Sequence, residues 1–159
     1  MNNFYDKYSD KLNESFYNSV AEIENLNKEL AFNKVPNGIY RVEVKDMSVK
    51  QSKRGNWMIM TIFKVLEGQY EGSLMSAFFM INKRWTEMNN GFLKALDTKI
   101  PIECRNILQY QQLVDDVFIT IRGEKQYDLE VENTATGFSN YRIIKSYDVE
   151  YEPLPFIDD

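Results

Sequence analysis

Two short stretches of the sequence combine basic and aromatic side chains in the way that a nucleic-acid-binding surface requires. The first contains Lys50, Ser52, Lys53, Arg54, Asn56 and Trp57, and the second contains Lys83, Arg84 and Trp85. Cationic side chains neutralise backbone phosphates, while an indole ring that stacks on a base contributes roughly 1 to 3 kcal/mol. Together the two stretches predict binding of a single-stranded nucleic acid, whose bases are open to stacking.

Phe78 and Phe79 precede the second stretch and are candidate stacking residues as well. Neighbouring positions of a strand point to opposite faces. We therefore expect one of the two rings in the core and the other on the binding surface, and the sequence leaves open which is which.

The residue types that most enzymes use are scarce. The chain has no histidine and a single cysteine, Cys104, which excludes His-based triads and the usual zinc sites, and glycine-rich phosphate loops are missing. We expect a non-enzymatic protein without a metal or another cofactor. One alternative is a metal-dependent nuclease, in which Asp128, Glu130 and Glu132 share a strand face and bind Mg²⁺.

Charge is distributed unevenly along the chain. The net charge is -5, yet residues 38–85 carry eight basic and four acidic side chains, whereas residues 148–159 carry five acidic side chains and no basic one. A basic middle next to an acidic end suits a nucleic-acid-binding domain with an acidic tail. The first residues lack a secretory signal and no window is long and apolar enough for a membrane span, so we expect a cytoplasmic protein that does not contact membranes.

Residues 1–35 are predicted to form an N-terminal helical segment. Within 7–32, apolar side chains recur every three or four positions, as on one face of an amphipathic helix. These side chains are Leu12, Phe16, Val20, Ile23, Leu26 and Leu30; at the fifth position of the stripe, Asn27 is an alternative to Leu26. The helix either packs on the domain or is loosely tethered to it, or it binds a partner or a second copy.

Residues 36–147 are predicted to form the domain, which is mainly β within the α+β class. Alternation and turn residues indicate strands at 39–49, 57–66, 73–81, 117–122, 127–131 and 141–147, with helices at 86–96 and 103–115. The expected core contacts of the helical region are Leu93, Leu96, Ile107, Leu108 and Leu113. Three strands, a helical insert and then two or three strands match a five-stranded OB-like barrel, with a generic α+β domain as the alternative.

The acidic tail, residues 148–159, contains apolar side chains that no predicted element buries. Its last six residues are Leu154, Pro155, Phe156, Ile157, Asp158 and Asp159. This end resembles the acidic Pro-Phe tip with which bacterial single-stranded-DNA-binding proteins recruit replication and repair enzymes, although that tip ends at its phenylalanine. The resemblance implies partner binding by the tail; the alternative is a tail without a partner.

Four motifs resemble a phage family that was first catalogued as a domain of unknown function and is regarded as single-stranded-DNA-binding. They are Val35-Pro36-Asn37-Gly38-x-Tyr40, Ser52-Lys53-x-Gly55-Asn56 with Met58, Phe63-x-Val65-Leu66-Glu67-Gly68-x-Tyr70-x-Gly72, and Gly137-Phe138-Ser139-Asn140-Tyr141-x-Ile143. The similarity covers about residues 32–147. It implies an OB-like fold, a role in phage replication or recombination without catalysis, and a loop at Ser52, Lys53, Gly55 and Asn56 beside the nucleic acid.

The sequence therefore predicts a phage protein that coats single-stranded DNA in the bacterial cytoplasm and meets phage or host replication and recombination proteins through its tail. It leaves the oligomeric state open, a homo-oligomer included. The rival hypothesis is a phage accessory protein or inhibitor that binds a host nucleic-acid enzyme, which the sequence pI of about 4.9 favours.

Overall fold

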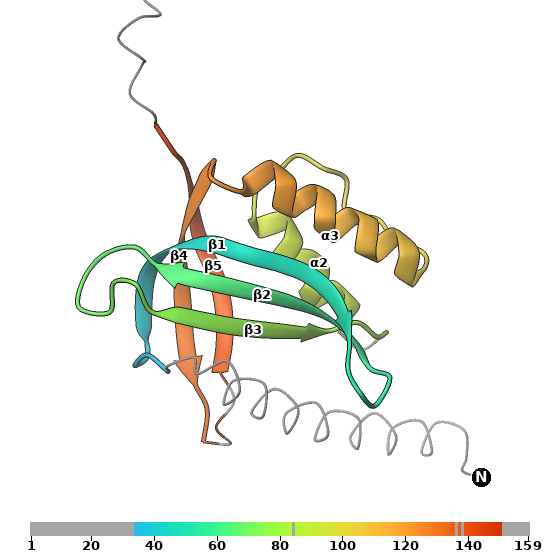
Figure 1. The fold of residues 1–159 in the computed structure, drawn as a ribbon, viewed down its shortest axis with the longest axis horizontal. Coiled ribbons are helices and arrows are strands. Elements are labelled where there is room, and N and C mark those ends of the chain that lie inside the picture. The colour runs from blue at the N-terminus through green and yellow to red at the C-terminus, as the bar shows by residue number, and fades with distance from the viewer. Residues whose placement is uncertain (1–33, 84, 136, 138, 151–159) are drawn as a thin grey trace, which may run out of the picture.

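The computed structural model describes residues 34–83, 85–135, 137 and 139–150 of the chain. Five strands and two helices follow in the order β1 (Gly38–Gln51), β2 (Trp57–Val65), β3 (Leu74–Met80), α2 (Thr86–Ala95), α3 (Ile107–Ile121), β4 (Lys125–Asn133) and β5 (Ser139–Asp148). The protein is thus mainly β, with both described helices between β3 and β4 (Figure 1).

All described strand pairs are antiparallel, in the sheet order β3-β2-β1-β4-β5. β1 is long enough to pair with two strands, because its first residues lie along β4 and its remaining residues lie along β2. It curves across the sheet (Figure 1). No strand pairing joins the two described edge strands, β3 and β5. The described strands therefore form an open sheet, and the predicted closure into a barrel is not shown by the strand pairing.

A bulge in β1 allows apolar residues at both even and odd positions of this strand to face the same core. Val42 and Val44 occupy even positions and point inward, whereas the next buried side chain, Met47, is at an odd position. The register shift between Val44 and Asp46 changes which residues face inward, so all three apolar side chains reach the core. A second register shift lies between β4 and β5 at Asp128 and Leu129.

The main core lies on the inner face of the sheet, which the helices cover. Phe92, Leu93 and Leu96, from α2 and the residue after it, meet inner-face side chains from all five strands. The ring of Phe79 on β3 stacks on Phe92 with ring centroids 4.3 Å apart. Val114, Val117 and Ile121 bring one face of α3 into the same core.

The strand predicted at 117–122 is wrong, because these residues form the last part of α3 and the residue that follows it. β-branched side chains favoured a strand there. However, Tyr110, Val114, Val117 and Ile121 are buried at spacings of three and four, and Ile119 between them is 64% exposed. Asn106 caps the start of the helix by accepting a hydrogen bond from the backbone N–H of Gln109 at 2.9 Å.

The other predicted elements agree with the structure apart from their ends. Three strands precede the helices and two follow them, and Leu93, Leu96 and Leu113 are buried as predicted. Leu108 is not a core residue: it is 72% exposed on the outer side of α3, because the buried stripe of that helix passes through Tyr110 and Val114 instead.

Both predicted appendages fall mainly outside the described residues. The predicted N-terminal helix lies there entirely, as does the tail from residue 151 onward. Val35, placed in the N-terminal segment by the sequence, is 3% exposed and belongs to the core, and its carbonyl accepts a 2.8 Å hydrogen bond from the Asn133 side chain. Neither α2 nor α3, the helices that the structure describes, is long and apolar enough to cross a membrane.

Candidate nucleic-acid interface

The turn between β1 and β2 is a compact loop that presents the first basic stretch. The backbone N–H of Ser52 donates to the Asn56 carbonyl at 2.8 Å, and the Gly55 N–H donates to the Ser52 carbonyl at 2.9 Å. The Ser52 hydroxyl accepts from the Asn56 N–H at 3.1 Å. Gly55 has φ +86°, which a residue with a side chain rarely adopts. These contacts explain the spacing of Ser52, Gly55 and Asn56 and leave Lys53 and Arg54 exposed at the tip.

Pairing of β2 with β3 brings the second basic stretch to the same end of the sheet. Met58 lies opposite Met80, and the backbone N–H of Ile81 donates to the Trp57 carbonyl at 2.9 Å. The turn that follows holds the exposed Lys83, while Arg84 lies outside the described residues. The two stretches, far apart in sequence, are therefore neighbours in the structure.

Polar contacts to α2 fix the turn after β3. The Asn82 side chain accepts a hydrogen bond from the Trp85 N–H at 3.2 Å, and the Asn82 carbonyl accepts one from the Thr86 hydroxyl at 2.9 Å. Asn89 on α2 is fully buried and its side-chain amide donates to the Met80 carbonyl. Sequence reasoning missed Asn89, because nothing local distinguishes a buried asparagine from an exposed one on a polar helix.

The two tryptophans belong to opposite faces of the sheet. Trp57 precedes Met58, which lies on the outer face, so alternation places Trp57 on the side of Ile59 and Phe63. Trp85 packs against Met58 and the other members of the outer cluster. Strand alternation therefore assigns Trp57 to the inner face, whereas packing places Trp85 against the outer cluster.

The structure resolves which phenylalanine faces inward. Phe79 belongs to the main core and is stacked under Phe92, so it is not available to a ligand and its place among the predicted stacking residues is not supported. Phe78 points to the opposite, outer face, but it is 6% exposed and packs with Met58, Met60 and Met80, so the prediction that one of the two rings lies open on the binding surface is not supported.

A group of charged and aromatic side chains on the outer face of β1, β4 and β5 went unnoticed in the sequence. Asp128 accepts from Arg41 Nε at 3.0 Å and from the Tyr147 hydroxyl at 2.6 Å. The Arg41 guanidinium lies 3.7 Å from the centre of the Tyr147 ring, and the Lys145 ammonium lies 4.9 Å from it. These residues come from three strands, so only knowledge of the strand pairing would have grouped them.

The same face disfavours the nuclease alternative. Asp128 and Glu130 do point to one side of β4 together, but Asp128 is paired with Arg41, and Glu130 lies 3.2 Å from Arg142 Nη2. Among the described residues there is no group of three acidic, cysteine or histidine side chains that could hold a metal ion. Asp128 and Glu130 therefore serve as partners of arginines, while Glu132, the third acid of that alternative, is exposed.

The sequence matches, over residues 21–151, the model of a family described as "Protein of unknown function (DUF669)". The chain belongs to this family. No curated protein matches it in sequence. The match agrees with the predicted resemblance to a family first catalogued as a domain of unknown function, and it begins earlier and ends later than the motifs did.

The DUF669 match takes in all the described strands and helices, both basic stretches and the charged group around Asp128. It also includes residues 21–33, which precede the described part of the chain. Part of the N-terminal segment therefore belongs to the region that defines the family.

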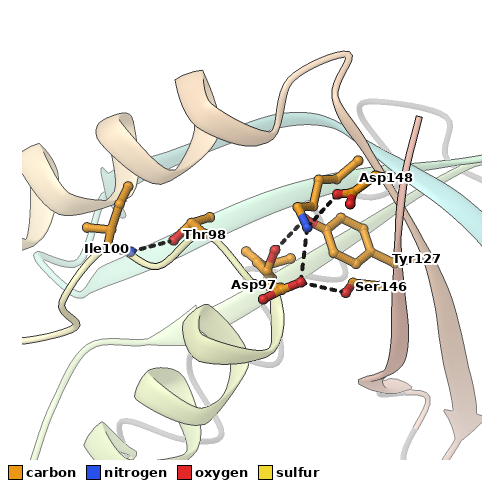
Figure 2. A network of polar contacts seen from close by, with 8 residues as sticks. Asp97, Thr98, Ile100, Tyr127, Ser146 and Asp148 are labelled. Atoms are coloured by element: carbon orange, nitrogen blue, oxygen red, sulfur yellow. Dashed lines mark hydrogen bonds and ion pairs between the residues drawn. The ribbon is translucent and has the colours of Figure 1, made fainter. Parts of the chain in front are cut away.

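A polar network joins the connection between α2 and α3 to the start of β4 and the end of β5 (Figure 2). Lys125 Nζ lies 3.0 Å from Asp97 Oδ2 and 2.9 Å from Asp148 Oδ1, and the Ser146 hydroxyl donates to Asp97 at 3.0 Å. The Tyr127 hydroxyl donates to the Leu96 carbonyl at 2.8 Å. Hydrogen bonds from Lys125 and Ser146 lower the pKa of Asp97. The network is structural, and it anchors Asp148, the first residue of the predicted tail.

Asp128→Asn should make the stability of the protein less dependent on pH in the acid range. Hydrogen bonds from Tyr147 and Arg41 hold the pKa of Asp128 below its ordinary value. A carboxylate with a depressed pKa contributes stability that is complete above its unfolded pKa and is lost as pH falls through its folded pKa. We expect the variant to be about 1 kcal/mol less stable at neutral pH, with the difference shrinking as the medium is acidified.

Urea unfolding at neutral and acid pH measures this difference. Glu132→Gln on the exposed part of the same strand is the control and should change the free energy of unfolding by less than about 0.5 kcal/mol. A difference between wild type and Asp128→Asn that stays constant with pH would contradict the assigned ion pair.

Proposed function

We propose that the protein binds single-stranded DNA without catalysing a reaction on it. One observation carries the proposal: the β2–β3 pairing brings the two basic and aromatic stretches to one end of the sheet, where the Trp57 carbonyl meets the Ile81 N–H at 2.9 Å. The DNA-binding residues would be Lys50, Ser52, Lys53, Arg54, Asn56, Trp57, Lys83, Arg84 and Trp85.

The electrostatics of this end support an anionic ligand despite the net charge of -5. Lys50, Lys53 and Lys83 are exposed, and none of the ion pairs found among the described residues engages them. Lys125 and Arg41, by contrast, are already paired with carboxylates. Charges without a carboxylate partner are the ones that can neutralise phosphates and release counterions.

The topology supports an OB-like barrel as the finer description of the fold. OB folds place a helix between the third and fourth of five strands and bind oligonucleotides on their barrel surface. Here β1 is shared by β2 and β4, the helices follow β3, and the edge strands β3 and β5 contact each other. We infer that β3 and β5 close the sheet into such a barrel.

The biological setting proposed is a phage replication or recombination module in the cytoplasm of a bacterial host. The acidic tail would recruit phage or host proteins through Leu154, Pro155, Phe156, Ile157, Asp158 and Asp159. This setting is supported by the resemblance of the motifs and of the tail. No metal or other cofactor is needed, since binding relies on charge and stacking alone.

A titration with a labelled single-stranded oligonucleotide tests the proposal. An oligonucleotide of about 40 nucleotides exceeds the roughly 4 to 16 nucleotides that one OB fold covers. We expect binding that weakens with salt and prefers the single strand to a duplex of the same sequence. Equal affinity for the duplex would refute single-strand specificity, and no binding at any salt concentration would favour the accessory or inhibitor hypothesis.

Removal of residues 151–159 should tighten DNA binding severalfold at low salt and have no effect at high salt. The segment carries three acidic side chains, Glu152, Asp158 and Asp159, which would compete with DNA for the basic end of the sheet. Truncation after Glu150 keeps Asp148, which is paired with Lys125.

A full-length variant with Glu152→Gln, Asp158→Asn and Asp159→Asn separates charge from length in this experiment. It should reproduce the truncation if electrostatic competition is the cause. Unchanged low-salt affinity in both proteins would rule out a tail that competes with DNA.

A further inference from the structure

The outer face of β2 and β3 carries an apolar cluster that is separate from the main core. Met58 is 2% exposed, Met60 5%, Phe78 6% and Met80 9%, and the partly buried Ile62 and Trp85 pack against them. We call these six residues the outer apolar face. It ends beside the basic end of the sheet, since Lys50 lies opposite Met58 in the β1–β2 register.

Such low exposure requires another layer of protein over this face. Side chains stand roughly perpendicular to a sheet, so neighbours on two strands cannot bury one another without a covering element. The described helices pack on the inner face. Ser48, which lies opposite Met60 in the β1–β2 register, has a buried hydroxyl without a hydrogen-bond partner among the described residues.

The N-terminal segment is the part of the chain that fits as this layer. As a helix, residues 7–32 would span about 39 Å, enough to follow the roughly 30 Å of β2. Its apolar stripe includes Phe16, Val20 and Ile23. The opposite end, residues 151–159, has nine residues with two prolines and is too short to cover both strands. The family match begins at residue 21, so part of the N-terminal segment lies in the region that defines the family.

The strand register gives the direction in which the segment would run. Residues 38–41 of β1 precede Val42, which pairs with Val65 at the last position of β2. A segment that joins β1 from this side would cross the outer apolar face toward Met58 and Met80 and reach the lysines at the basic end. Residues 1–33 carry six acidic and three basic side chains; in the half that would meet those lysines, Lys7 and Lys11 offset two of the three acids, so this half would compete with DNA mainly by covering the basic end.

We propose that residues 7–32 dock as an amphipathic helix on the outer apolar face of their own chain, with their first half beside the basic end of the sheet. The docked segment and single-stranded DNA then compete for that end. Docking stands independently of the proposed function, whereas the competition rests on it.

Substitutions on the apolar stripe test the docking. Val20→Asp with Ile23→Asp places two charges on the stripe, and Asn18→Asp with Asn25→Asp places the same two charges on the opposite side of the helix. In a Trp57→Phe background, Trp85 is the remaining tryptophan and reports on the outer apolar face. Acrylamide should quench Trp85 severalfold more strongly in the stripe variant than in the wild type or the matched control. Equal quenching in all three would overturn the proposal.

Trypsin digestion of the unmodified protein gives a second test that does not depend on a variant folding. Lys7, Lys11 and Lys28 are cleavage sites within the segment. Most of the stability of a helix in a protein comes from packing of its apolar face, so a synthetic peptide of residues 1–33, which lacks that packing, should be cut quickly. We expect much slower cleavage at Lys28 in the full chain. Cleavage as fast as in the peptide, or protection only in a dimer seen by sedimentation, would overturn docking on the same chain.

DNA titration of the two variants tests the competition. The stripe variant should bind single-stranded DNA at least about tenfold more tightly than the charge-matched control. The reason is that undocking the segment raises the fraction of molecules whose basic end is open to DNA. Equal DNA affinity of the two variants would overturn the competition. If neither variant nor wild type binds DNA, the proposed function fails, while quenching and proteolysis still decide whether the segment docks.

Discussion

Alanine at Lys50, Lys53 and Lys83 together is expected to weaken single-stranded DNA binding by about 10- to 100-fold at low salt. The three lysines come from the end of β1, the β1–β2 tip and the turn after β3, and they are exposed. On a single strand each neutralised phosphate contributes about 0.7 to the slope of log K against log salt, so the slope should fall by about 2. Fluorescence titration at four or more salt concentrations measures both quantities.

The control removes three positive charges elsewhere. Lys94 lies in the last turn of α2, Arg105 precedes α3 and Arg122 follows it, and all three are exposed. Alanine at these positions changes the net charge equally and should leave the slope within about 0.7 of the wild-type value. Equal losses in the two triple variants would show that binding responds to net charge and not to the basic end of the sheet.

Phe79→Ala should lower the free energy of unfolding by about 3 to 5 kcal/mol. The ring lies in the main core, 8% exposed, with its centroid 4.3 Å from that of Phe92. Truncation removes the stacked contact and leaves a cavity that the surrounding strands and helix can fill only in part. The melting temperature should drop by about 10 °C, as measured by urea and thermal unfolding.

Ile119→Ala serves as the matched control, because Ile119 is 64% exposed on the outer side of α3 and should contribute less than about 0.5 kcal/mol. DNA affinity of the folded Phe79→Ala protein should equal that of the wild type. A stable Phe79→Ala protein that had lost DNA binding would instead show that this ring reaches the ligand.

The two predictions separate residues that the sequence grouped together. The three lysines and Phe79 were candidates for one binding surface on the basis of residue type alone. The fold places the lysines in solvent and the ring in the core, so their substitution should affect different measurements. Trp57 and Trp85 likewise differ, since alternation along β2 assigns Trp57 to the inner face while Trp85 packs against the outer cluster.

Local sequence patterns predicted an element correctly where the spacing of its apolar residues matches the spacing of the residues that the fold buries. Alternation of Tyr40, Val42 and Val44 identified β1, and the loop residues Ser52, Gly55 and Asn56 identified the turn that follows. Residues 117–122 show the opposite case. Their β-branched side chains suit a strand, yet packing of α3 against the sheet buries Val117 and Ile121 at helical spacing.

The sequence by itself determined the residue types of the candidate site, the strands that hold them and the contrast between a basic middle and an acidic end. Those properties depend on composition and on periods of two to four residues, which are visible locally. Only the tertiary structure decided that Trp57 and Ile81 are neighbours, that Phe79 points inward and Phe78 outward, and that Arg41 meets Asp128 and Tyr147. Those facts depend on strand register and on bulges, where a shift of one residue moves every following side chain to the other face of the sheet.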